Sequence, residues 1–361
     1  MKILICVENL LMDGVKRVAT VLGNALASTE DVTYYSLAST PSFFELNAPL
    51  IMATHPVNTG KSFRGSVPLQ VYTVQINDLV TTIDRGGYDI VIVTAGLLTS
   101  FTPVIKKRIP KVRVIAWLHN NYETYTTNYY RNMLVEFEAG LRAADCVVVL
   151  TSHDLERFSK IQPNTVKIYN PITVNPTAAS DLKSHVISAV SRLDIAQKGL
   201  DLMVQAATQL PEDWEIHLAG AGQDREQLEA LIQSRHASAK IKLLGSLSDR
   251  ELLTHYRTSS VFIMTSRWEG LPLVIGEAMS FGLPVVSMTN TGAREYLKDG
   301  KFGILTPDHD VDAFTQRLQP LIASPQQRQY WATQSLKRAQ SFSLSHIVGI
   351  WRTLFHELTA A

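Results

Sequence analysis

The sequence has little of what marks secreted, membrane-spanning or nucleic-acid-binding proteins. Its two cysteines, Cys6 and Cys146, lie inside short apolar runs, which excludes a disulfide framework and favours a reducing cytoplasm. No apolar run approaches the roughly 20 residues of a membrane-spanning helix, and no signal-peptide cleavage site follows the N-terminus. The 34 Lys and Arg residues balance 33 Asp and Glu residues, so we expect a cytoplasmic protein with no nucleic-acid partner.

Sequence motifs of several other enzyme classes are missing or incomplete. The chain has no G-x-x-x-x-G-K-[S/T] phosphate loop and no Cys and His residues with the spacing of metal ligands. Gly220-Ala-Gly222 supplies the first two glycines of a dinucleotide fingerprint, but Arg225 occupies the place of the third. This motif also lies in the middle of the chain rather than after the first strand, so a dehydrogenase is disfavoured.

What the sequence does contain is a regular alternation of short apolar runs and amphipathic stretches. Apolar runs rich in β-branched residues are typical of strands buried on both faces of a parallel sheet, and the stretches between them have helical spacing. This pattern predicts an α/β fold, and 361 residues, 45% of them hydrophobic, suffice for two doubly wound domains or one large barrel. The expected strands are Lys2–Val7, Asp89–Val93, Val112–Leu118, Cys146–Leu150, Val186–Val190, Glu215–Ala219, Ile241–Leu244, Val261–Thr265 and Pro284–Met288. The expected helices include Val15–Ala27, Tyr130–Ala144, Gly199–Gln209, Asp224–Ser234 and Asp249–Ser259.

A segment near the middle of the chain favours two domains over one barrel. Residues 169–177 contain two prolines, two asparagines and no helical period, which is typical of an interdomain linker. We therefore expect an N-terminal domain over residues 1–170 and a C-terminal domain over residues 171–340. Apolar residues at helical spacing between Ser341 and Leu358 predict a terminal helix, within residues 341–361, that needs a partner surface.

Residues 265–287 hold the strongest candidate for a functional site. After an expected strand comes a Gly-Leu-Pro turn, and Pro272 is expected in the first turn of a helix. Glu269 precedes this helix and Glu277 lies within it. The free N–H groups and the positive end of a helix dipole suit an anionic or hydroxyl-rich ligand at the carboxyl edge of a parallel sheet. Taken alone, however, two such glutamates are more often solvated side chains on an ordinary loop and helix.

The neighbouring motifs strengthen the functional interpretation. Glu269 and Glu277 look like the E-x7-E signature of retaining glycosyltransferases of the GT-B fold, in the large family 4 group (GT4). Four segments resemble motifs of this family in their order along the chain, namely Val190–Leu200, Leu218–Gly222, Leu244–Asp249 and Thr265–Ser287. The resemblance covers residues 186–306 well and the N-terminal half more loosely. It implies two Rossmann-like domains whose parallel sheets face across a cleft, with the terminal helix packing back on the N-terminal domain.

The resemblance also implies roles for individual residues. Arg192 and Lys198 are expected to bind the diphosphate of a nucleotide sugar, where fixed cations stabilise the negative charge that grows as the glycosidic bond breaks. Glu277 is expected to accept hydrogen bonds from the ribose hydroxyls, and Glu269 to lie near the transferred sugar. Further donor contacts are implied for Gly222, Leu247 and the backbone of Gly270, Leu271, Leu273 and Val274.

In the N-terminal half, the resemblance rests mainly on one histidine and one glycine. His119 follows the expected strand Val112–Leu118 and matches the family's histidine at the cleft, so it is expected to orient the donor sugar and the acceptor hydroxyl. Gly14 matches a glycine of the first loop that lets the backbone approach the diphosphate. The family usually has two glycines here, whereas this chain has Asp13 before Gly14, so the resemblance does not fix the conformation of this loop.

Three further segments each have a functional and a structural interpretation. Asp308-His-Asp310 has the spacing of a metal-binding Asp-x-Asp motif, but the resemblance implies cations in place of a metal and no cofactor besides the donor substrate. Residues 120–130 are rich in tyrosine and amide side chains, which either contact sugars or pack on the next helix. Residues 106–113 include five basic side chains, which bind an anionic acceptor or a membrane surface, or form a solvated helix end.

These observations predict a metal-independent, retaining hexosyltransferase of GT4 type. The expected donor is UDP-glucose or UDP-GlcNAc, and the expected acceptor is a hydroxyl of a glycan, a polyol-phosphate polymer or a glycolipid in cell-surface polysaccharide synthesis. The expected location is the cytoplasm, including the inner face of the membrane. Two alternatives stay open, a UDP-sugar epimerase on the same fold and a non-catalytic partner subunit. Catalysis is favoured because all five charged or titratable family residues are present, His119, Arg192, Lys198, Glu269 and Glu277.

Overall fold

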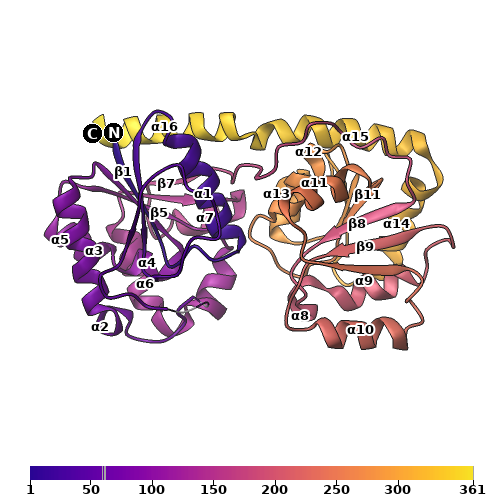
Figure 1. Ribbon diagram of the computed structural model, residues 1–361, viewed down its shortest axis with the longest axis horizontal. Helices are drawn as coiled ribbons and strands as arrows, with labels where there is room; N and C mark the ends of the chain where they lie inside the picture. The colour runs from indigo at the N-terminus through magenta and orange to yellow at the C-terminus, as the bar shows by residue number, and fades with distance from the viewer. Residues whose placement is uncertain (59, 61, 361) are drawn as a thin grey trace. The chain divides into compact units, whose positions relative to one another are not determined.

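The chain forms two compact units, each built around its own sheet. The computed structural model describes residues 1–58, 60 and 62–360 (Figure 1). The first unit comprises Met1–Thr173 and the C-terminal segment that starts at Leu344, and the second unit comprises Val174–Ser343. Because two separate sheets are present, the single large barrel that the sequence left open is excluded.

The first unit contains a parallel sheet of seven strands. These are β1 (Lys2–Val7), β2 (Asp31–Ser36), β3 (Leu50–Met52), β4 (Ile90–Thr94), β5 (Arg113–Trp117), β6 (Cys146–Val149) and β7 (Thr165–Lys167). Their order is β3-β2-β1-β4-β5-β6-β7, so the direction of winding reverses between β1 and β4. In register, Cys6 lies opposite Val93, which lies opposite Ala116. The carboxyl ends of β1, β4 and β5 therefore meet at one edge, where ligands bind in such sheets.

Helices cover both faces of this sheet. They are α1 (Gly14–Leu26), α2 (Pro68–Val71), α3 (Thr73–Gly86), α4 (Ala95–Ser100), α5 (Thr102–Arg108), the π-helix η1 (Thr124–Tyr129), the 3-10 helix η2 (Arg131–Met133), α6 (Leu134–Ala143), α7 (Ser152–Phe158) and α16 (Leu344–Ala360). The α16 helix packs on the first unit, where the ring of Trp351 lies 4.9 Å from that of Trp117 in β5. The Thr359 hydroxyl contacts the Met1 sulfur, so the two ends of the chain lie together (Figure 1). Residue 361, the last of the expected terminal segment 341–361, lies outside the described residues.

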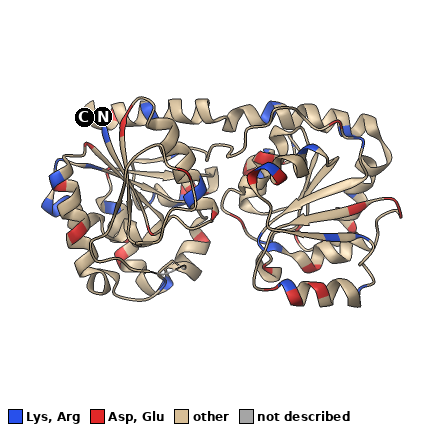
Figure 2. Cartoon of the chain, in the orientation of Figure 1, with Lys and Arg blue, Asp and Glu red and all other residues tan. Residues whose placement is uncertain are grey.

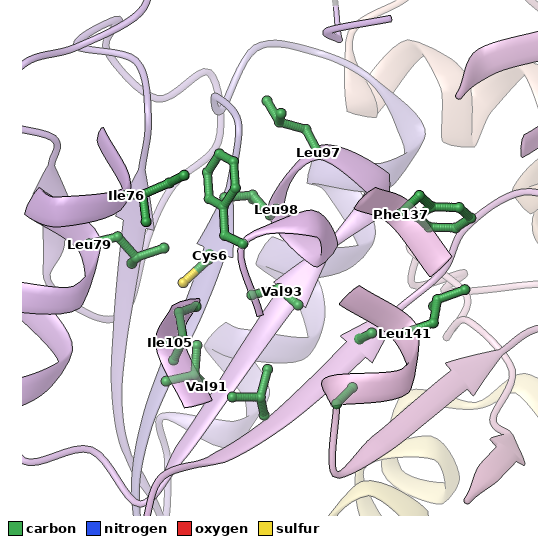
Figure 3. Packing of buried hydrophobic residues seen from close by; sticks show 14 of the residues in the cluster. Cys6, Ile76, Leu79, Val91, Val93, Leu97, Leu98, Ile105, Phe137 and Leu141 are labelled. Atoms are coloured by element: carbon green, nitrogen blue, oxygen red, sulfur yellow. The ribbon is translucent and has the colours of Figure 1, made fainter. Parts of the chain in front are cut away.

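A hydrophobic core fills the space between one face of the first sheet and helices α3 to α6. Figure 3 shows the strand residues Cys6, Val91 and Val93 in the same cluster as Leu98 of α4 and Phe137 of α6. All five side chains are fully buried. Burial raises the pKa of the Cys6 thiol, so this side chain serves as a small apolar packing group rather than a nucleophile.

The second unit contains a parallel sheet of six strands. These are β8 (Val186–Val190), β9 (Glu215–Ala219), β10 (Ile241–Gly245), β11 (Val261–Met264), β12 (Val285–Met288) and β13 (Ile304–Thr306), in the order β10-β9-β8-β11-β12-β13. Its helices are α8 (Ile195–Lys198), α9 (Leu200–Ala207), α10 (Arg225–Ser234), α11 (Asp249–Arg257), α12 (Leu273–Ser280), α13 (Thr291–Leu297), α14 (Val311–Ala323), α15 (Pro325–Ala339) and the 3-10 helix η3 (Gln340–Phe342). One face packs on α9, α10 and α14. The winding reverses between β8 and β11, so the carboxyl ends of these strands form the expected site edge.

The nine strands expected from the sequence are all present, with ends that differ by a residue in most cases. Four more strands were missed, β2, β3, β7 and β13. Three of them, β3, β7 and β13, have three residues each and form the outer strands of their sheets, so they lack the long apolar run that identifies a buried strand. β2 was missed because Asp31, Thr33 and Ser36 interrupt its apolar pattern.

Charge is spread over the surface rather than concentrated. Figure 2 shows Lys and Arg interspersed with Asp and Glu on the helices of both units, in agreement with a formal net charge of +1. Among the described residues, no helix is long and apolar enough to cross a membrane.

A close contact between α4 and α6 yields a test of the first unit. A β-carbon at Gly140 would lie 2.1 Å from the Thr99 carbonyl oxygen, so we expect Gly140→Ala to lower the free energy of unfolding by about 1–3 kcal/mol. Gly349→Ala in α16 is the control, because nothing lies within 4 Å of its β-carbon and alanine favours a helix by about 0.5–1 kcal/mol. Urea unfolding measures both effects. Equal effects of the two substitutions would contradict the α4–α6 contact.

Candidate active site

The loops that follow β8 and β9 run against each other at the carboxyl edge of the second sheet. The backbone N–H of Leu193 donates to the carbonyl of Ala221 over 2.9 Å. A β-carbon at Gly220, whose φ is +142°, would lie 1.8 Å from the Ser191 carbonyl oxygen, and one at Gly222 would lie 2.3 Å from that of Leu193. Glycine is therefore required at both positions for packing, which accounts for the partial dinucleotide fingerprint without a dinucleotide.

A second close approach joins the end of α8 to the loop after β11. Gly199 has φ +59°, and a β-carbon on it would lie 2.1 Å from the Thr265 carbonyl oxygen. The Thr265 hydroxyl in turn donates to the carbonyl of Lys198 over 3.0 Å. This contact fixes the backbone of Lys198 against the strand end that leads to Glu269.

Arg267 ties the same two segments together with its side chain. Its guanidinium donates to both carboxylate oxygens of Asp201, at 2.9 and 2.7 Å, and to the carbonyls of Ile195 and Ala196, at 3.2 and 3.1 Å. Burial works against the Asp201 carboxylate, but the hydrogen bond and charge of Arg267 outweigh it and lower the pKa of Asp201. Since Asp201 follows Lys198 by three residues and Arg267 precedes Glu269 by two, this ion pair positions both. The sequence interpretation missed Arg267 and Asp201.

Lys198 and Glu269 form an ion pair. The Lys198 ammonium lies 2.6 Å from Glu269 Oε1, and the two side chains are only 13% and 11% exposed. The sequence motifs placed both residues in one site but did not predict that they contact each other. A buried ion pair is strong only when well hydrogen-bonded, and removing one partner strands the other charge. The pair therefore holds a cation and a carboxylate together at the edge of the sheet.

Gln197 links this pair to Arg192. The exposed Arg192 guanidinium donates to Gln197 Oε1 over 2.8 Å, and Gln197 Nε2 points at the Trp268 carbonyl at 3.4 Å. The Gln197 carbonyl also accepts the Arg267 N–H over 2.9 Å. Gln197 was not identified as a site residue, although it lies between the two predicted cations. It holds the Arg192 head group in place while leaving that group accessible.

Helix α12 carries the second glutamate. Glu277 is 4% exposed, and Tyr256 of α11 donates its hydroxyl to Glu277 Oε2 over 3.0 Å. Pro272, expected within the first turn, is instead the residue that caps the helix, so Leu273 is the first helical residue. The N–H groups of Leu273 and Val274 belong to the first turn, where a helix offers no acceptor of its own. They therefore stand as donors at the positive end of α12.

The loop between Glu269 and α12 is held from its other side as well. Asn290, before α13, donates its side-chain amide to the Ser266 carbonyl over 2.8 Å. A β-carbon at Gly292 would lie 2.4 Å from the Gly270 carbonyl oxygen. Leu271 is buried, which anchors the turn in the protein. Gly270 is thus held against α13 and Leu271 is held by its burial, and their N–H groups are held with them.

Leu247 is the remaining residue of the expected donor contacts. It lies in the loop between β10 and α11 and lines a depression of about 310 Å³ together with Leu244, Arg250 and His255. The His255 ring hydrogen-bonds to Ser188 over 2.7 Å, and burial lowers the pKa of His255 to about 4. This imidazole is accordingly neutral near pH 7 and serves as a buried packing and hydrogen-bonding group.

The Asp308-His-Asp310 segment has roles in folding. Asp310 caps α14 by accepting the Ala313 N–H over 2.8 Å, and His309 accepts a hydrogen bond from Arg267 over 2.9 Å. Asp308 in turn pairs with His309. Within the described part of the chain, no group of three or more His, Cys, Asp or Glu side chains is arranged to hold a metal ion.

In the first unit, His119 follows β5 at the carboxyl edge of the sheet. Its backbone N–H donates to the Tyr125 hydroxyl over 2.9 Å, and its ring lies 4.5 Å from that of Trp117. Both ring nitrogens are buried without a hydrogen-bond partner among the described residues. Burial, assisted by the nearby Lys16 charge, lowers the pKa of His119 to about 3, so the ring is neutral near pH 7. Gly14 begins α1 at the same edge, capped by Asp13.

The two ambiguous segments of the first unit are at least partly structural. Tyr125 and Tyr130 are buried and stacked with ring centroids 5.1 Å apart. The Tyr130 hydroxyl accepts the Gly96 N–H over 2.9 Å, so packing is the correct interpretation for these two tyrosines. In the basic cluster, Lys106 and Arg113 both pair with Asp145, at 2.8 and 3.3 Å, so these two cations hold α5 and β5 to the start of β6.

Comparisons with known proteins agree with this geometry. Residues 175–338, nearly the whole second unit, match the family model described as glycosyl transferases group 1. The second unit belongs to this family. The chain is 26% identical over 369 aligned positions to the amylovoran biosynthesis glycosyltransferase AmsD of Erwinia amylovora, covering 98% of this chain and 99% of the relative. The resemblance inferred from the motifs is therefore confirmed, and with it the expectation of a glycosyltransferase at the level of family.

Solved structures show the fold. The sucrose-phosphate synthase of Thermosynechococcus elongatus superposes with a TM-score of 0.85 at 18% identity, covering 99% of both chains. Anabaena Alr3699/HepE, in complex with UDP and glucose, superposes with a TM-score of 0.76 at 19% identity, covering 98% of this chain and 99% of the other. The expected GT-B fold, with two parallel α/β units, is confirmed.

The Arg267–Asp201 pair gives a test of how the site is held. Arg267→Ala removes a bidentate ion pair and two carbonyl contacts, so we expect it to lower the free energy of unfolding by about 1–3 kcal/mol. The control is Arg294→Ala, because Arg294 makes a single exposed pair with Asp299, a kind worth about 0–1 kcal/mol. Urea unfolding gives the free energy of unfolding of the two single variants Arg267→Ala and Arg294→Ala. The same measurement on Asp201→Asn alone and combined with Arg267→Ala gives the coupling energy between Arg267 and Asp201. Additive effects of Asp201→Asn and Arg267→Ala would contradict this role.

The neutral state of His119 makes a prediction about pH. Its folded pKa of about 3 lies below the value of about 6.5 in an unfolded chain, so the unfolded state binds more protons between these values. Protonation of His119 in the unfolded chain therefore lowers the free energy of unfolding as the pH falls below about 6.5, by up to about 1.4 kcal/mol per pH unit. His119→Asn should flatten the pH dependence of the unfolding free energy between pH 6 and 4.5. Parallel curves for the wild type and the variant would show that His119 is not buried in its neutral form.

Proposed function

We propose that the chain is a metal-independent, retaining glycosyltransferase that moves a hexose from a nucleotide sugar to a hydroxyl group. The donor we propose is UDP-linked, UDP-glucose or UDP-GlcNAc, and the acceptor is a glycan, a polyol-phosphate polymer or a glycolipid in cell-surface polysaccharide synthesis. The observation that carries the proposal is the Lys198–Glu269 pair, 2.6 Å apart at the carboxyl edge of the second sheet and linked through Gln197 to Arg192.

The two cations suit the leaving group of this reaction. The bond between the anomeric carbon and the diphosphate breaks with its electron pair on the diphosphate oxygen, so negative charge grows there in the transition state. Lys198 supplies a point charge and Arg192 a planar fork that grips phosphate oxygens through two N–H groups. Both are prepositioned, so their stabilisation requires little reorganisation during the reaction. They take the place that a metal ion occupies in other transferases.

The glutamates suit the sugar parts of the donor. Glu277, fixed by Tyr256, has two carboxylate oxygens for the two ribose hydroxyls. Glu269 accepts hydrogen bonds from hydroxyls of the transferred sugar and favours positive charge at its anomeric carbon. The acceptor oxygen forms the new bond on the face that the diphosphate leaves, and its proton passes to the leaving diphosphate. This route requires no separate nucleophile and base.

The comparisons support the substrate class. The relative from Erwinia amylovora is named for amylovoran biosynthesis, and the Anabaena Alr3699/HepE structure contains UDP and glucose. The first suggests a polysaccharide product for this chain, and the second suggests a UDP-linked donor.

A donor screen tests the proposal directly. We expect UDP-glucose or UDP-GlcNAc to raise the melting temperature of the purified protein, and the protein to release UDP and free sugar slowly when no acceptor is added. An epimerised UDP-sugar as the product would favour the epimerase alternative. If no nucleotide sugar shifts the melting temperature, the chain is not a transferase of this type and the partner-subunit alternative gains support.

The roles of the ion pair make a further prediction. Lys198→Ala and Glu269→Ala should each lower the rate of UDP release by about 100-fold or more, because they remove groups aimed at charge in the transition state. Lys242→Ala is the control. Lys242 lies in the same unit, but its side chain is 61% exposed and its ammonium makes only a long pair of 4.0 Å with the Glu215 carboxylate. Circular dichroism and thermal melts establish that each variant is folded. Near-normal release by both site variants would overturn these roles.

A further inference from the structure

The first unit buries polar groups at its site edge that the proposed chemistry does not use. Glu8 directly follows β1, Lys16 lies in the first turns of α1, and His119 follows β5. The register of β1, β4 and β5 brings the two strand ends to the same edge, about 10 Å apart along the hydrogen-bonding direction. The charge of Lys16 acts on both Glu8 and His119, which places its ammonium near both groups.

Glu8 is the least expected of these residues. Glu8 is only 6% exposed, and its Oε1 atom has no hydrogen-bond partner among the described residues. The carboxyl accepts a hydrogen bond from the Ser62 side chain. An unpartnered buried polar atom costs about 1–3 kcal/mol, and an apolar side chain at position 8 would remove that cost. The site therefore retains a group that lowers stability, as expected where a ligand supplies the missing partner.

Charges of both signs lie around Glu8. The Lys16 ammonium is buried and paired with Asp13, and the charges of Asp13 and Arg64 also act on Glu8. Burial raises the pKa of Glu8, with Lys16 opposing it. The Glu8 carboxyl accepts hydrogen bonds in either protonation state, and the two nitrogens of the neutral His119 ring offer one donor and one acceptor. A sugar hydroxyl likewise both donates and accepts, so its chemistry matches both groups.

We propose that Glu8 binds a hydroxyl group of a pyranose ring at the carboxyl edge of the first sheet, with the unpartnered His119 ring as the second hydrogen-bonding group. The inference rests on the proposed function, because a transferase handles two sugars, that of the donor and that of the acceptor. It adds a specificity-determining residue that lies outside the four sequence motifs of the second unit.

The test uses two substitutions at Glu8 in the full-length protein. Glu8→Leu removes the hydrogen-bonding group while keeping a similar volume, and Glu8→Gln keeps a donor and an acceptor. Thr102→Val is the matched control, because Thr102 of α5 also buries a hydroxyl oxygen without a partner among the described residues but plays no part in the proposed site. Urea unfolding shows whether Glu8 stabilises the fold.

Two kinetic measurements separate the possible sugars. The KM for UDP-glucose and UDP-GlcNAc hydrolysis without acceptor reports on the donor sugar. The half-maximal concentration of methyl α-glucoside or methyl α-N-acetylglucosaminide that stimulates UDP release reports on the acceptor sugar. Inhibition by UDP alone reports on the nucleotide, which Glu8 is not expected to touch.

We expect Glu8→Leu to be at least as stable as the wild type. We also expect it to raise one of the two sugar constants, the donor KM or the half-maximal acceptor concentration, about tenfold or more, which corresponds to a loss of about 1.4 kcal/mol of binding free energy. Glu8→Gln should lose less, and UDP inhibition and Thr102→Val should be unchanged. Sugar constants within twofold of the wild type in Glu8→Leu would overturn the inference, as would a loss of stability in Glu8→Leu without a change in either constant.

Failure of the proposed function is distinguishable from failure of this inference. If the wild type acts on no nucleotide sugar, the transferase proposal fails, and binding of free glucose, galactose and N-acetylglucosamine is then measured by ligand-observed NMR. Binding to the wild type but not to Glu8→Leu would still support a sugar site at Glu8. Absence of binding to the wild type, or equal binding to both proteins, would overturn it.

Discussion

The candidate active site depends on how tightly the loops at the carboxyl edge of the second sheet are held together. The bidentate pair of Arg267 and Asp201 joins the loop after β11 to the α8–α9 segment. Glycine at position 199 allows the same two segments to touch through their backbones. Without these contacts, Lys198 and Glu269 would lie on two independent loops, and a displacement of about 1 Å in such groups is enough to cost a large part of a catalytic rate.

The Lys198–Glu269 pair shows what this rigidity makes possible. The two side chains are nearly buried, and an ammonium in such surroundings needs a compensating charge. Glu269 supplies it before any substrate binds, so the cation is held ready at the edge of the sheet. In the proposed reaction, the diphosphate of the donor joins this preformed charge arrangement, and the exposed Arg192 side chain reaches it from outside.

The two units differ in how their polar groups are satisfied. In the second unit, Lys198 and Glu269 bind each other, Glu277 binds Tyr256, and Arg192 binds Gln197. In the first unit, polar atoms of Glu8 and His119 are buried without partners among the described residues. A ligand of the proposed kind would exchange existing contacts in the second unit, whereas in the first it would supply the hydrogen bonds that Glu8 Oε1 and the His119 ring lack. The arrangement in the first unit carries the energetic cost of buried polar atoms that lack a partner.

The sequence by itself determined the α/β class and the longer strands, because buried parallel strands leave an apolar pattern, and its resemblance to a known family pointed to the motif residues of the second unit. It missed the three-residue strands, which have too few residues for a pattern, and it left the tyrosines of residues 120–130 undecided. Only the tertiary structure decided that Tyr125 and Tyr130 pack inside, that Arg267 pairs with Asp201, and that Glu8 Oε1 is buried without a hydrogen-bond partner among the described residues. These facts depend on distances between residues far apart in the chain, and such distances arise only when strand order and register bring the segments together.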